Sequence, residues 1–497
     1  MKLTCRLLTI FFMLFFFYQP VFAQEGTLKW KYVTSAANVL PPAIGPDGTI
    51  YLSDIYYFYD SMEQRRKGTY ILAINPDGTL KWKSEDYPYS LINNILSVLN
   101  DGTIFFTLGD DSGHGYYLSS LKPDGTKNKF GGYYVSKGAF GDFFYFYDDH
   151  DYAFPVLYVV NPDGTLNKEI ETGAGQPFIG YDGSVYFNNG HILNRLNSIG
   201  NIQIIDSYDL SGRMIAIGKD NTLYVAGSTF RALNSEGSLI WEYSLTQVFN
   251  CAVDNEGIIY AATNYSIYDD YLFAINPDGS LKWKFREESA DKQKIKSPCI
   301  GSDGIIYFVD VIYGESYIYA LNPDGTFRWR FHTENNITDE FFPMLDKNGS
   351  LYVLDFMGTL YSIQTSSKGY QKNAPWPCCS HDNGHTFNAG NIDTIVEENG
   401  EINTPAEFRL LQNYPNPFNP TTTISFALPK PGNVEVSVYN IMGQKIRELA
   451  YEVLAAGRYS FVWDGRDSNG KIVSSGIYFS RLESGGKIAI GKMLLMK

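Results

Sequence analysis

The chain has 497 residues, with 40 Lys and Arg residues, 54 Asp and Glu residues and a formal net charge of −14. This length predicts two or three domains, and the acidic balance argues against nucleic acid or an anionic membrane as a partner. The five cysteines are too few to hold a chain of this size by disulfides, so we expect a fold stabilised by burial.

Residues 1–23 have the pattern of an export signal. Lys2 and Arg6 precede an apolar run from Leu7 to Tyr18, and a small-residue site ends at Ala23, after which we expect cleavage. The apolar run is shorter than a membrane-spanning helix needs, and no later stretch qualifies. The sequence therefore predicts a protein that is secreted through the periplasm and has no transmembrane segment.

A repeat with a period of roughly 36 to 47 residues fills the region from residue 24 to residue 387, which is the length of one four-stranded propeller blade. One turn of each unit has the form Asn-Pro-Asp-Gly between two apolar runs. It starts at Asn75, Asn161, Asn276 and Asn322, with weaker copies at Lys122, Asn197, Asn234 and Gln364. A second Asp-Gly turn precedes an Ile-Tyr strand in the other half of each unit, and Ala139 to Tyr147 is its degenerate copy. We count eight units, with seven as the alternative.

The turn chemistry makes each unit two β-hairpins, with strands A and B followed by C and D. Pro presets the second turn position, Asp stabilises the next, and Gly takes the left-handed position. Such a sheet cannot bury both of its faces alone, so the units should pack around an axis as a β-propeller. Residues 26–32 match the segment that follows a C–D turn, and we expect them to close the ring as strand D of the last unit.

The segment Ala73-Ile-Asn-Pro-Asp-Gly-Thr-Leu-Lys-Trp82 resembles the repeat of the PQQ-like propeller family, and the resemblance covers nearly all of residues 25–387. It implies an all-β, eight-bladed propeller. The family includes quinone-dependent dehydrogenases and also many non-catalytic scaffolds, so it does not specify a function. Because no calcium-binding Glu, Asn and Asp set with a stacking Trp is recognisable, we expect neither PQQ nor another cofactor.

A second domain is expected after an acidic linker at residues 388–407. Residues 408–497 contain alternating strands, Thr422 to Leu428, Val434 to Tyr439, Tyr459 to Trp463, Gly476 to Leu482 and Lys487 to Met496, which fit one small β-sandwich of the immunoglobulin or fibronectin type. Tyr414 to Phe418, Val438 to Gly443 and Gly476 to Tyr478 closely resemble the type IX secretion C-terminal sorting domain. The resemblance implies export to the cell surface by the type IX machinery. It places the sorting signal at Lys492, Met493, Leu494, Leu495, Met496 and Lys497.

One cluster of side chains has metal-ligand chemistry, namely Cys378, Cys379, His381 and His385, since two thiolates and two imidazoles suit tetrahedral zinc. A structural role is the favoured interpretation, because adjacent cysteines rarely both reach one ion and residues 376–386 resemble a segment that borders PQQ-like propellers without a metal. A vicinal disulfide stays open. Cys251 and Cys299 are offset by one position on neighbouring A strands, so we expect two buried free thiols. No catalytic residues are assigned.

The B–C loops are the predicted binding region, because they are longer and more irregular than the Asp-Gly turns of the opposite rim. Their Tyr and Asp side chains suit a glycan, a peptide or a surface polymer. The alternative is that Tyr only covers blade edges while the acids keep the protein soluble. Calcium at Asp110 or Asp148 is a further possibility with no recognised loop spacing. The candidate residues are Tyr57, Tyr59, Asp60, Asp110, Asp111, Asp148, Asp149, Tyr152, Asp269, Asp270 and Tyr313.

The composition and motifs favour a non-catalytic surface scaffold or binding protein. The alternative function is an extracellular enzyme, similar to a quinoprotein dehydrogenase or acting as a hydrolase or lyase, with its site at the centre of the ring. No nucleophile elbow, phosphate loop or dinucleotide fingerprint is present in the sequence, and these are the motifs that would support an enzyme most directly.

Overall fold

The computed structural model describes residues 24–35, 41–92, 97–110, 117–127, 137–141, 144–148, 156–161, 165–171, 175–189, 192–196, 202–206, 213–245, 248–263, 270–287, 293–337, 342–382, 385, 408–410, 413, 418, 422–454, 457–468 and 470–496. The predicted signal at residues 1–23 and the predicted linker at 388–407 lie outside these residues. Within the described part of the chain, no helix is long and apolar enough to cross a lipid bilayer.

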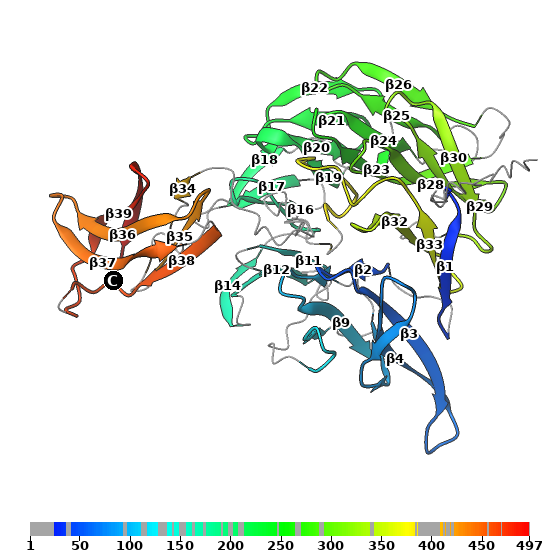
Figure 1. Cartoon of the computed structure of the whole chain (residues 1–497), viewed down its shortest axis with the longest axis horizontal. Helices are drawn as coiled ribbons and strands as arrows, with labels where there is room; N and C mark the ends of the chain where they lie inside the picture. The colour runs from blue at the N-terminus through cyan, green and yellow to red at the C-terminus, as the bar shows by residue number, and fades with distance from the viewer. Residues whose placement is uncertain are drawn as a thin grey trace, which may run out of the picture.

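Eight antiparallel sheets succeed one another along the chain and form a ring (Figure 1). This confirms the all-β propeller with eight blades. In order from strand A to strand D, blade 1 holds β2 (Ala43–Ile44), β3 (Ile50–Tyr59), β4 (Arg65–Ile74) and β5 (Leu80–Lys83), and β6 (Tyr87–Pro88) also pairs with β4. In blade 2 strand A has two parts, β7 (Ser90–Ile92) and β8 (Ser97–Val98), which both pair with strand B, β9 (Ile104–Asp110), and strand C is β10 (Tyr117–Leu121). Within the described residues, strand D of this blade is represented by the bridge between Leu121 and Lys127. Blade 3 holds β11 (Lys137–Phe140), β12 (Phe144–Asp148), β13 (Val156–Val160) and β14 (Leu166–Glu171).

The remaining blades follow the same order. Blade 4 holds β15 (Phe178–Ile179), β16 (Val185–Asn189), β17 (Ile192–Leu196) and β18 (Ile202–Asp206), and blade 5 holds β19 (Arg213–Ile217), β20 (Leu223–Ala226), β21 (Phe230–Leu233) and β22 (Leu239–Tyr243). Blade 6 holds β23 (Val248–Val253), β24 (Ile259–Thr263), β25 (Leu272–Ile275) and β26 (Leu281–Phe285), and blade 7 holds β27 (Gln293–Ile300), β28 (Ile306–Ile312), β29 (Glu315–Leu321) and β30 (Phe327–His332). Blade 8 holds β31 (Met344–Leu345), β32 (Ser350–Leu354), β33 (Thr359–Gln364) and the N-terminal β1 (Leu28–Val33).

Blade 8 is assembled from both ends of the propeller sequence. Strand β1 pairs antiparallel with β33, with Lys31 opposite Tyr361. The Gly26 N–H donates to the Gln364 carbonyl at 2.9 Å, and the Gln364 N–H donates to the Thr27 carbonyl at 2.9 Å. These two bonds reproduce, across a break in the chain, the turn that other blades make within one segment. The ring is therefore closed by hydrogen bonds between distant segments, which leaves no open sheet edge at this seam.

The repeated turns have the hydrogen bonding that their residues favour. In blade 1 the Gly78 N–H donates to the Asn75 carbonyl at 2.9 Å, and the Asp77 carboxylate accepts from both the backbone N–H and the hydroxyl of Thr79. Gly78 has a φ of +88°, which a residue with a side chain rarely adopts. The hydroxyl of Thr79 lowers the pKa of Asp77, so the turn is stabilised by an ionised carboxylate.

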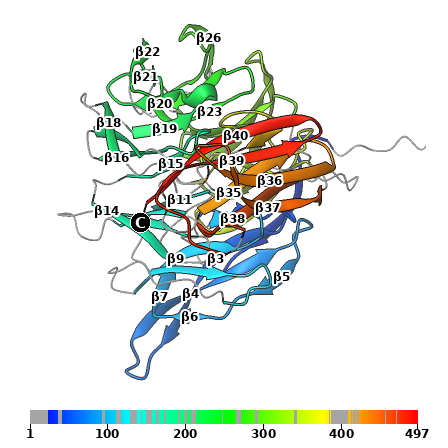
Figure 2. The ribbon, with the colours of Figure 1, turned by 90° about the vertical axis from the view of Figure 1, so that its left-hand side faces the viewer.

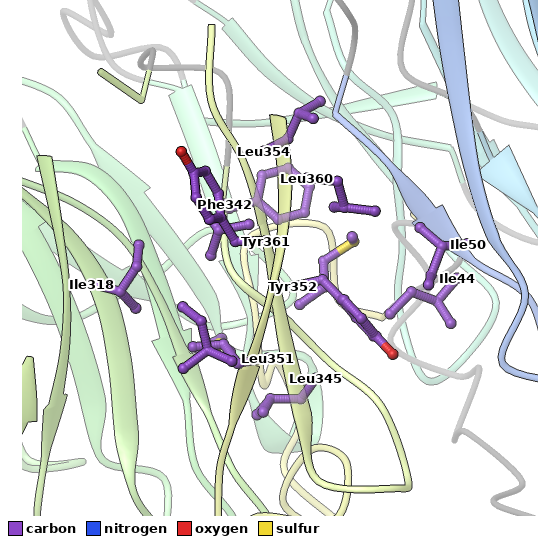
Figure 3. Close-up of a cluster of buried hydrophobic side chains, with 14 of the residues drawn as sticks. Ile44, Ile50, Ile318, Phe342, Leu345, Leu351, Tyr352, Leu354, Leu360 and Tyr361 are labelled. Carbon is purple, nitrogen blue, oxygen red and sulfur yellow. The ribbon is translucent and has the colours of Figure 1, made fainter. Parts of the chain in front are cut away.

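Apolar faces of neighbouring blades meet to form the core. Figure 3 shows the cluster between blades 7, 8 and 1, in which Leu351 lies toward Ile318 on one side of blade 8 and Tyr352 lies toward Ile50 on the other side. All of these side chains are buried. Each sheet packs one face against the preceding blade and the other face against the following blade. The blades therefore depend on one another for burial, as repeat units do.

A tryptophan on strand D connects several blades to the next one. Each of these Trp side chains donates its indole N–H to the carbonyl of the Pro in the C–D turn of the following blade. The pairs are Trp30 with Pro76 at 3.0 Å, Trp82 with Pro123 at 3.1 Å, Trp241 with Pro277 at 2.9 Å and Trp283 with Pro323 at 3.1 Å. The outer strands are therefore linked by specific polar contacts as well as by the apolar core.

The C-terminal domain is a β-sandwich, as expected, and Figure 2 shows its two sheets in orange and red. One sheet has the order β34 (Arg409–Leu410), β35 (Thr422–Leu428), β38 (Gly457–Trp463), and the other has β37 (Lys445–Leu454), β36 (Gly432–Asn440), β39 (Gly476–Ser484), β40 (Lys487–Leu495). The sequence did not predict β37. Trp463, Leu482 and Met493 lie in the core between the sheets.

Candidate ligand-binding rim

Successive strands of each blade alternate in direction, which places the A–B and C–D turns on one rim and the B–C connections on the other. The B–C connections of blades 5, 7 and 8 are short turns at residues 227–229, 313–314 and 355–358, so the expectation of longer B–C loops is wrong for these blades. The A–B and C–D turns are short on one rim. On the opposite rim the B–C hairpin of blade 1 is much longer, since β3 and β4 remain paired from Ile50–Ile74 out to Tyr59–Arg65. In both views the tip of this blue hairpin extends beyond the ring (Figures 1 and 2).

Tyr57 and Tyr59, two of the predicted binding residues, lie on this hairpin with exposed side chains. Their exposed fractions are 49% and 73%. The Arg65 guanidinium lies over the Tyr57 ring, 4.0 Å from its centroid, which is the geometry of a cation–π contact. Arg65 was not among the binding residues predicted from the sequence, although it lies on β4, which pairs with the strand that holds the two tyrosines.

Asp60 is used inside the turn that joins β3 to β4. Its carboxylate accepts hydrogen bonds from the backbone N–H groups of Met62 and Gln64, both at 2.9 Å, and from Arg66 Nε at 2.9 Å. The Arg66 hydrogen bond is the main cause that lowers the pKa of Asp60. We conclude that Asp60 stabilises the tip of the hairpin.

The other predicted binding residues have different positions. Tyr313, in the turn between β28 and β29, is 59% exposed. Asp270 is completely buried, so its side chain is not part of the open surface that was expected. Asp110 and Asp148 are the last residues of β9 and β12. The side chains of these two, and the residues Asp111, Asp149, Tyr152 and Asp269, lie outside the described part of the structure.

Asp270 belongs to a buried acidic group between blades 6 and 7 that the sequence analysis did not identify. Its neighbour Asp310, on β28, is also fully buried and accepts a hydrogen bond of 2.5 Å from Gln293 Nε2. Burial raises the pKa of Asp310 to about 8, and the nearby Glu287 and Asp270 add to the effect. The only sequence signal was an acidic residue at the end of the apolar run of β28.

Residues 366–382 and 385, here called the crossing segment, contact strand A of four blades. The Ser302 and Ile300 N–H groups of blade 7 donate to Gly369 and Pro377, and the Val253 N–H of blade 6 donates to Trp376. The Trp376 ring contacts the Phe178 ring of blade 4 at 5.6 Å, and the Ser97 hydroxyl of blade 2 donates to the carbonyl of His385 at 3.2 Å. Since these blades lie on different sides of the ring, the segment spans its centre at the A–B turns, where it is drawn in yellow in Figure 1.

The predicted metal candidates all belong to the crossing segment. Cys378, His381 and His385 are buried and Cys379 is half-buried, and all the described cysteines are free. His381 Nδ1 lies 3.3 Å from a carboxylate oxygen of Asp382. No group of three or more His, Cys, Asp or Glu residues suited to a metal ion is found among the described residues.

Cys378 also lies near the thiol of Cys299, a proximity that was not predicted from the sequence. Cys299, on β27, and Cys378 belong to one apolar cluster, against which Cys379 packs. Burial raises the pKa of Cys378 to about 12 and raises the pKa of Cys299, so the reactive thiolate form is disfavoured in both. Cys251 belongs to a different cluster, and its burial with Cys299 confirms the two buried free thiols expected on neighbouring A strands.

Comparisons with known proteins give one family match and several distant structural likenesses. A family model for the FlgD Ig-like domain matches residues 415–486. No curated protein matches the sequence. Three similar solved structures are the Dos1 propeller (11% identity, 70% of this chain and 97% of that chain, TM-score 0.48), streptogramin B lyase (15%, 67% and 97%, TM-score 0.40) and PorZ, an essential bacterial surface component of the type-IX secretion system of Porphyromonas gingivalis (14%, 95% and 76%, TM-score 0.35).

The chain is thus a β-propeller protein with a C-terminal immunoglobulin-like domain. The fold follows from the sheet topology of this chain, and propellers carry many unrelated functions. The function has to be argued from the surfaces of this chain.

Proposed function

We propose that the protein is a secreted or cell-surface binding protein without catalytic activity, which recognises a glycan, a peptide or a surface polymer through its B–C loops. The observation that carries this proposal is the long β3–β4 hairpin, which presents Tyr57 and Tyr59 exposed on a rigid ring. Large aromatic side chains provide contact area at a low cost in conformational entropy. A rigid scaffold with variable loops at one rim is a common arrangement for recognition.

The crossing segment bears on the alternative of an enzyme with a site at the ring centre. It covers strand A of blades 2, 4, 6 and 7 on the side of the A–B turns, so a substrate would have to enter from the B–C rim. A binding role for that rim needs no access to the centre. We therefore prefer the binding protein.

The binding proposal is tested with glycan and peptide arrays probed with the full-length protein. Replacement of Tyr57, Tyr59 and Tyr313 by Ala should weaken any ligand found by at least about tenfold, because each removes an exposed aromatic contact worth about 1 kcal/mol. Tyr451→Ala is the matched control, since Tyr451 is 69% exposed on the sandwich. Equal binding by the triple variant and the wild type would contradict the proposal.

We also propose that the C-terminal domain directs type IX export, as its resemblance to sorting domains implies. Met493 and Leu495 are buried in the sandwich, so the surface that a receptor could contact in the terminal segment is formed by Lys492, Leu494 and Met496. The full-length chain should reach the cell surface in a type IX-proficient bacterium and remain in the periplasm of a strain that lacks the system. Protease treatment of intact cells measures this, and equal surface exposure in both strains would disprove it.

A further inference from the structure

The hairpin of blade 1 has two different faces, and the register of its strands defines them. Tyr57 lies opposite Lys67, and Tyr59 lies opposite Arg65. Directly opposed residues of an antiparallel pair share one face of the sheet. The four side chains Tyr57, Tyr59, Arg65 and Lys67, here called the Tyr–cation face, therefore project from the same side.

The opposite face of the hairpin packs on the propeller. The Phe58 ring meets the Tyr89 ring edge-on at 5.0 Å, and the Tyr56 ring stacks on Tyr70 at 5.8 Å. The Tyr89 N–H donates to the Lys67 carbonyl at 3.1 Å. These contacts hold the hairpin, so the Tyr–cation face is presented to solvent in a fixed orientation.

The charge of the Tyr–cation face is opposite to that of the chain. The tip carboxylate of Asp60 pairs with Arg66 on the other face at 2.9 Å. Within the described residues neither Arg65 nor Lys67 forms an ion pair, and both are exposed. The face thus carries two unneutralised cations beside two tyrosine rings, in a protein with a net charge of −14.

We propose that the Tyr–cation face binds an acidic polysaccharide, an inference that rests on the proposed binding function. Tyr57 and Tyr59 are two positions apart on one strand, which separates them by about 7 Å, so their rings can contact successive parts of an extended chain. Flat sugar faces pack on aromatic rings, while Arg65 and Lys67 bind the carboxylate or sulfate oxygens. An acidic peptide carries the same charge but lacks the flat sugar faces that pack on the two tyrosine rings, which makes it a poorer fit.

Binding of the full-length protein to immobilised polygalacturonate, a sulfated glycan, neutral dextran and an acidic peptide of poly-glutamate tests the inference. We expect binding to at least one acidic polymer, with an affinity that falls as the salt concentration rises. The polymer that binds shows whether the face recognises carboxylate or sulfate groups. Arg65→Gln with Lys67→Gln should weaken it by at least about tenfold, and Tyr57→Ala with Tyr59→Ala by a similar factor. The matched control, Lys471→Gln with Lys487→Gln, removes the same charge from exposed positions of the sandwich and should leave binding unchanged.

The failure of this inference can be distinguished from failure of the proposed function. Binding to neutral dextran or to an acidic peptide alone would overturn the acidic polysaccharide while leaving a binding protein. Salt-independent binding of the wild type would overturn it as well, without depending on any variant. An absence of binding on glycan and peptide arrays would overturn both.

Discussion

Burial between two blades changes the protonation of Asp310. Its side chain is fully buried, and among the described residues only one of its carboxylate oxygens, the acceptor from Gln293, has a hydrogen-bond partner. A buried carboxyl in this condition is more stable when protonated, because the charge would lose its hydration. Its pKa is raised to about 8 by burial first and by nearby acids second.

The raised pKa predicts that stability falls as pH rises. Between the pKa of the unfolded chain, near 4, and the pKa of about 8 in the folded protein, the folded state binds one more proton than the unfolded state. Stability is then lost with rising pH at about 1 kcal/mol per pH unit from this group. Urea unfolding of the wild type and Asp310→Asn from pH 5 to pH 8 should show this dependence in the wild type and a smaller one in the variant.

An exposed acid provides the control. Asp278 lies in a C–D turn, and the hydroxyl of Ser280 lowers its pKa. Asp278→Asn should therefore leave the pH dependence between pH 5 and pH 8 unchanged, since this group is ionised in both states over that range. If Asp310→Asn retains the slope of the wild type, the buried proton is not on Asp310.

The sequence predicted the positions of individual side chains less well than it predicted the fold. Tyr57 and Tyr59 were selected for their type and place in a loop, and their exposure agrees with that choice. Asp270 was selected for the same reason but is buried, because the chain after residue 269 turns into the interface between blades 6 and 7. Composition indicates a loop, but the side of the backbone that faces the core depends on contacts between blades.

The Trp of strand D links a strand of one blade to a turn of the next blade. Trp283 on β26 donates to the Pro323 carbonyl at 3.1 Å and lies against Gly325 of the same turn. The Leu-Lys-Trp run was recognised in the sequence as part of the repeat, but its partner in the next blade was not. The reason is that the contact depends on how two blades meet and leaves no pattern within one blade.

Removal of this contact should destabilise the interface between blades 6 and 7. Trp283→Ala loses the ring contact and the hydrogen bond and should lower the free energy of unfolding by about 3 kcal/mol. Trp283→Phe keeps an aromatic ring without the indole N–H and should cost about 1 kcal/mol. Denaturant unfolding measures both values.

Leu281→Ala on the same strand is the comparison, because Leu281 is 42% exposed and makes no contact of this kind. It should cost less than Trp283→Phe. Equal losses for Leu281→Ala and Trp283→Ala would show that the indole contributes only general burial.

The equivalent positions in blades 3 and 4 are Lys168 and Ile204, so these blades lack the contact and should unfold earlier in hydrogen exchange.

The repeat period predicted a ring with eight blades or, as the alternative, seven, and the structure has eight sheets in the ring. Turn residues recur at fixed positions, and a sheet that cannot cover itself must pack on copies of itself. The path of the crossing segment and the length of the β3–β4 hairpin could not be predicted in this way. Both depart from the repeat, and each is determined by contacts with several blades instead of by a local pattern.

Ring closure depends on residues 25–33, which contact blades 7 and 8. Glu25 forms a bidentate ion pair with Arg328 of blade 7, with distances of 2.7 and 2.9 Å. Gly26, with a φ of +73°, lies against the Trp329 ring, where an added Cβ would approach ring atoms to 2.8 Å. Glu25 and Gly26 thus join blade 8 to blade 7, while β1 completes the sheet of blade 8.

Gly26→Val should weaken closure of the ring. Valine is strained at this φ and collides with Trp329, so β1 should detach from β33. We expect a loss of about 3 kcal/mol and faster amide exchange in residues 28–33 and 359–364 than in other blades. Hydrogen exchange followed by mass spectrometry measures the exchange segment by segment.

Gly314→Val separates backbone strain from the loss of closure. Gly314 has a φ of +88°, and a Cβ there would meet no atom within 4 Å. The substitution should cost about 1 to 2 kcal/mol of backbone strain without a change in exchange at β1 and β33. If Gly26→Val leaves the exchange of those two strands unchanged, the seam is not the place where the ring opens, and the pairing of β1 with β33 must be stronger than the strain imposed at its first turn.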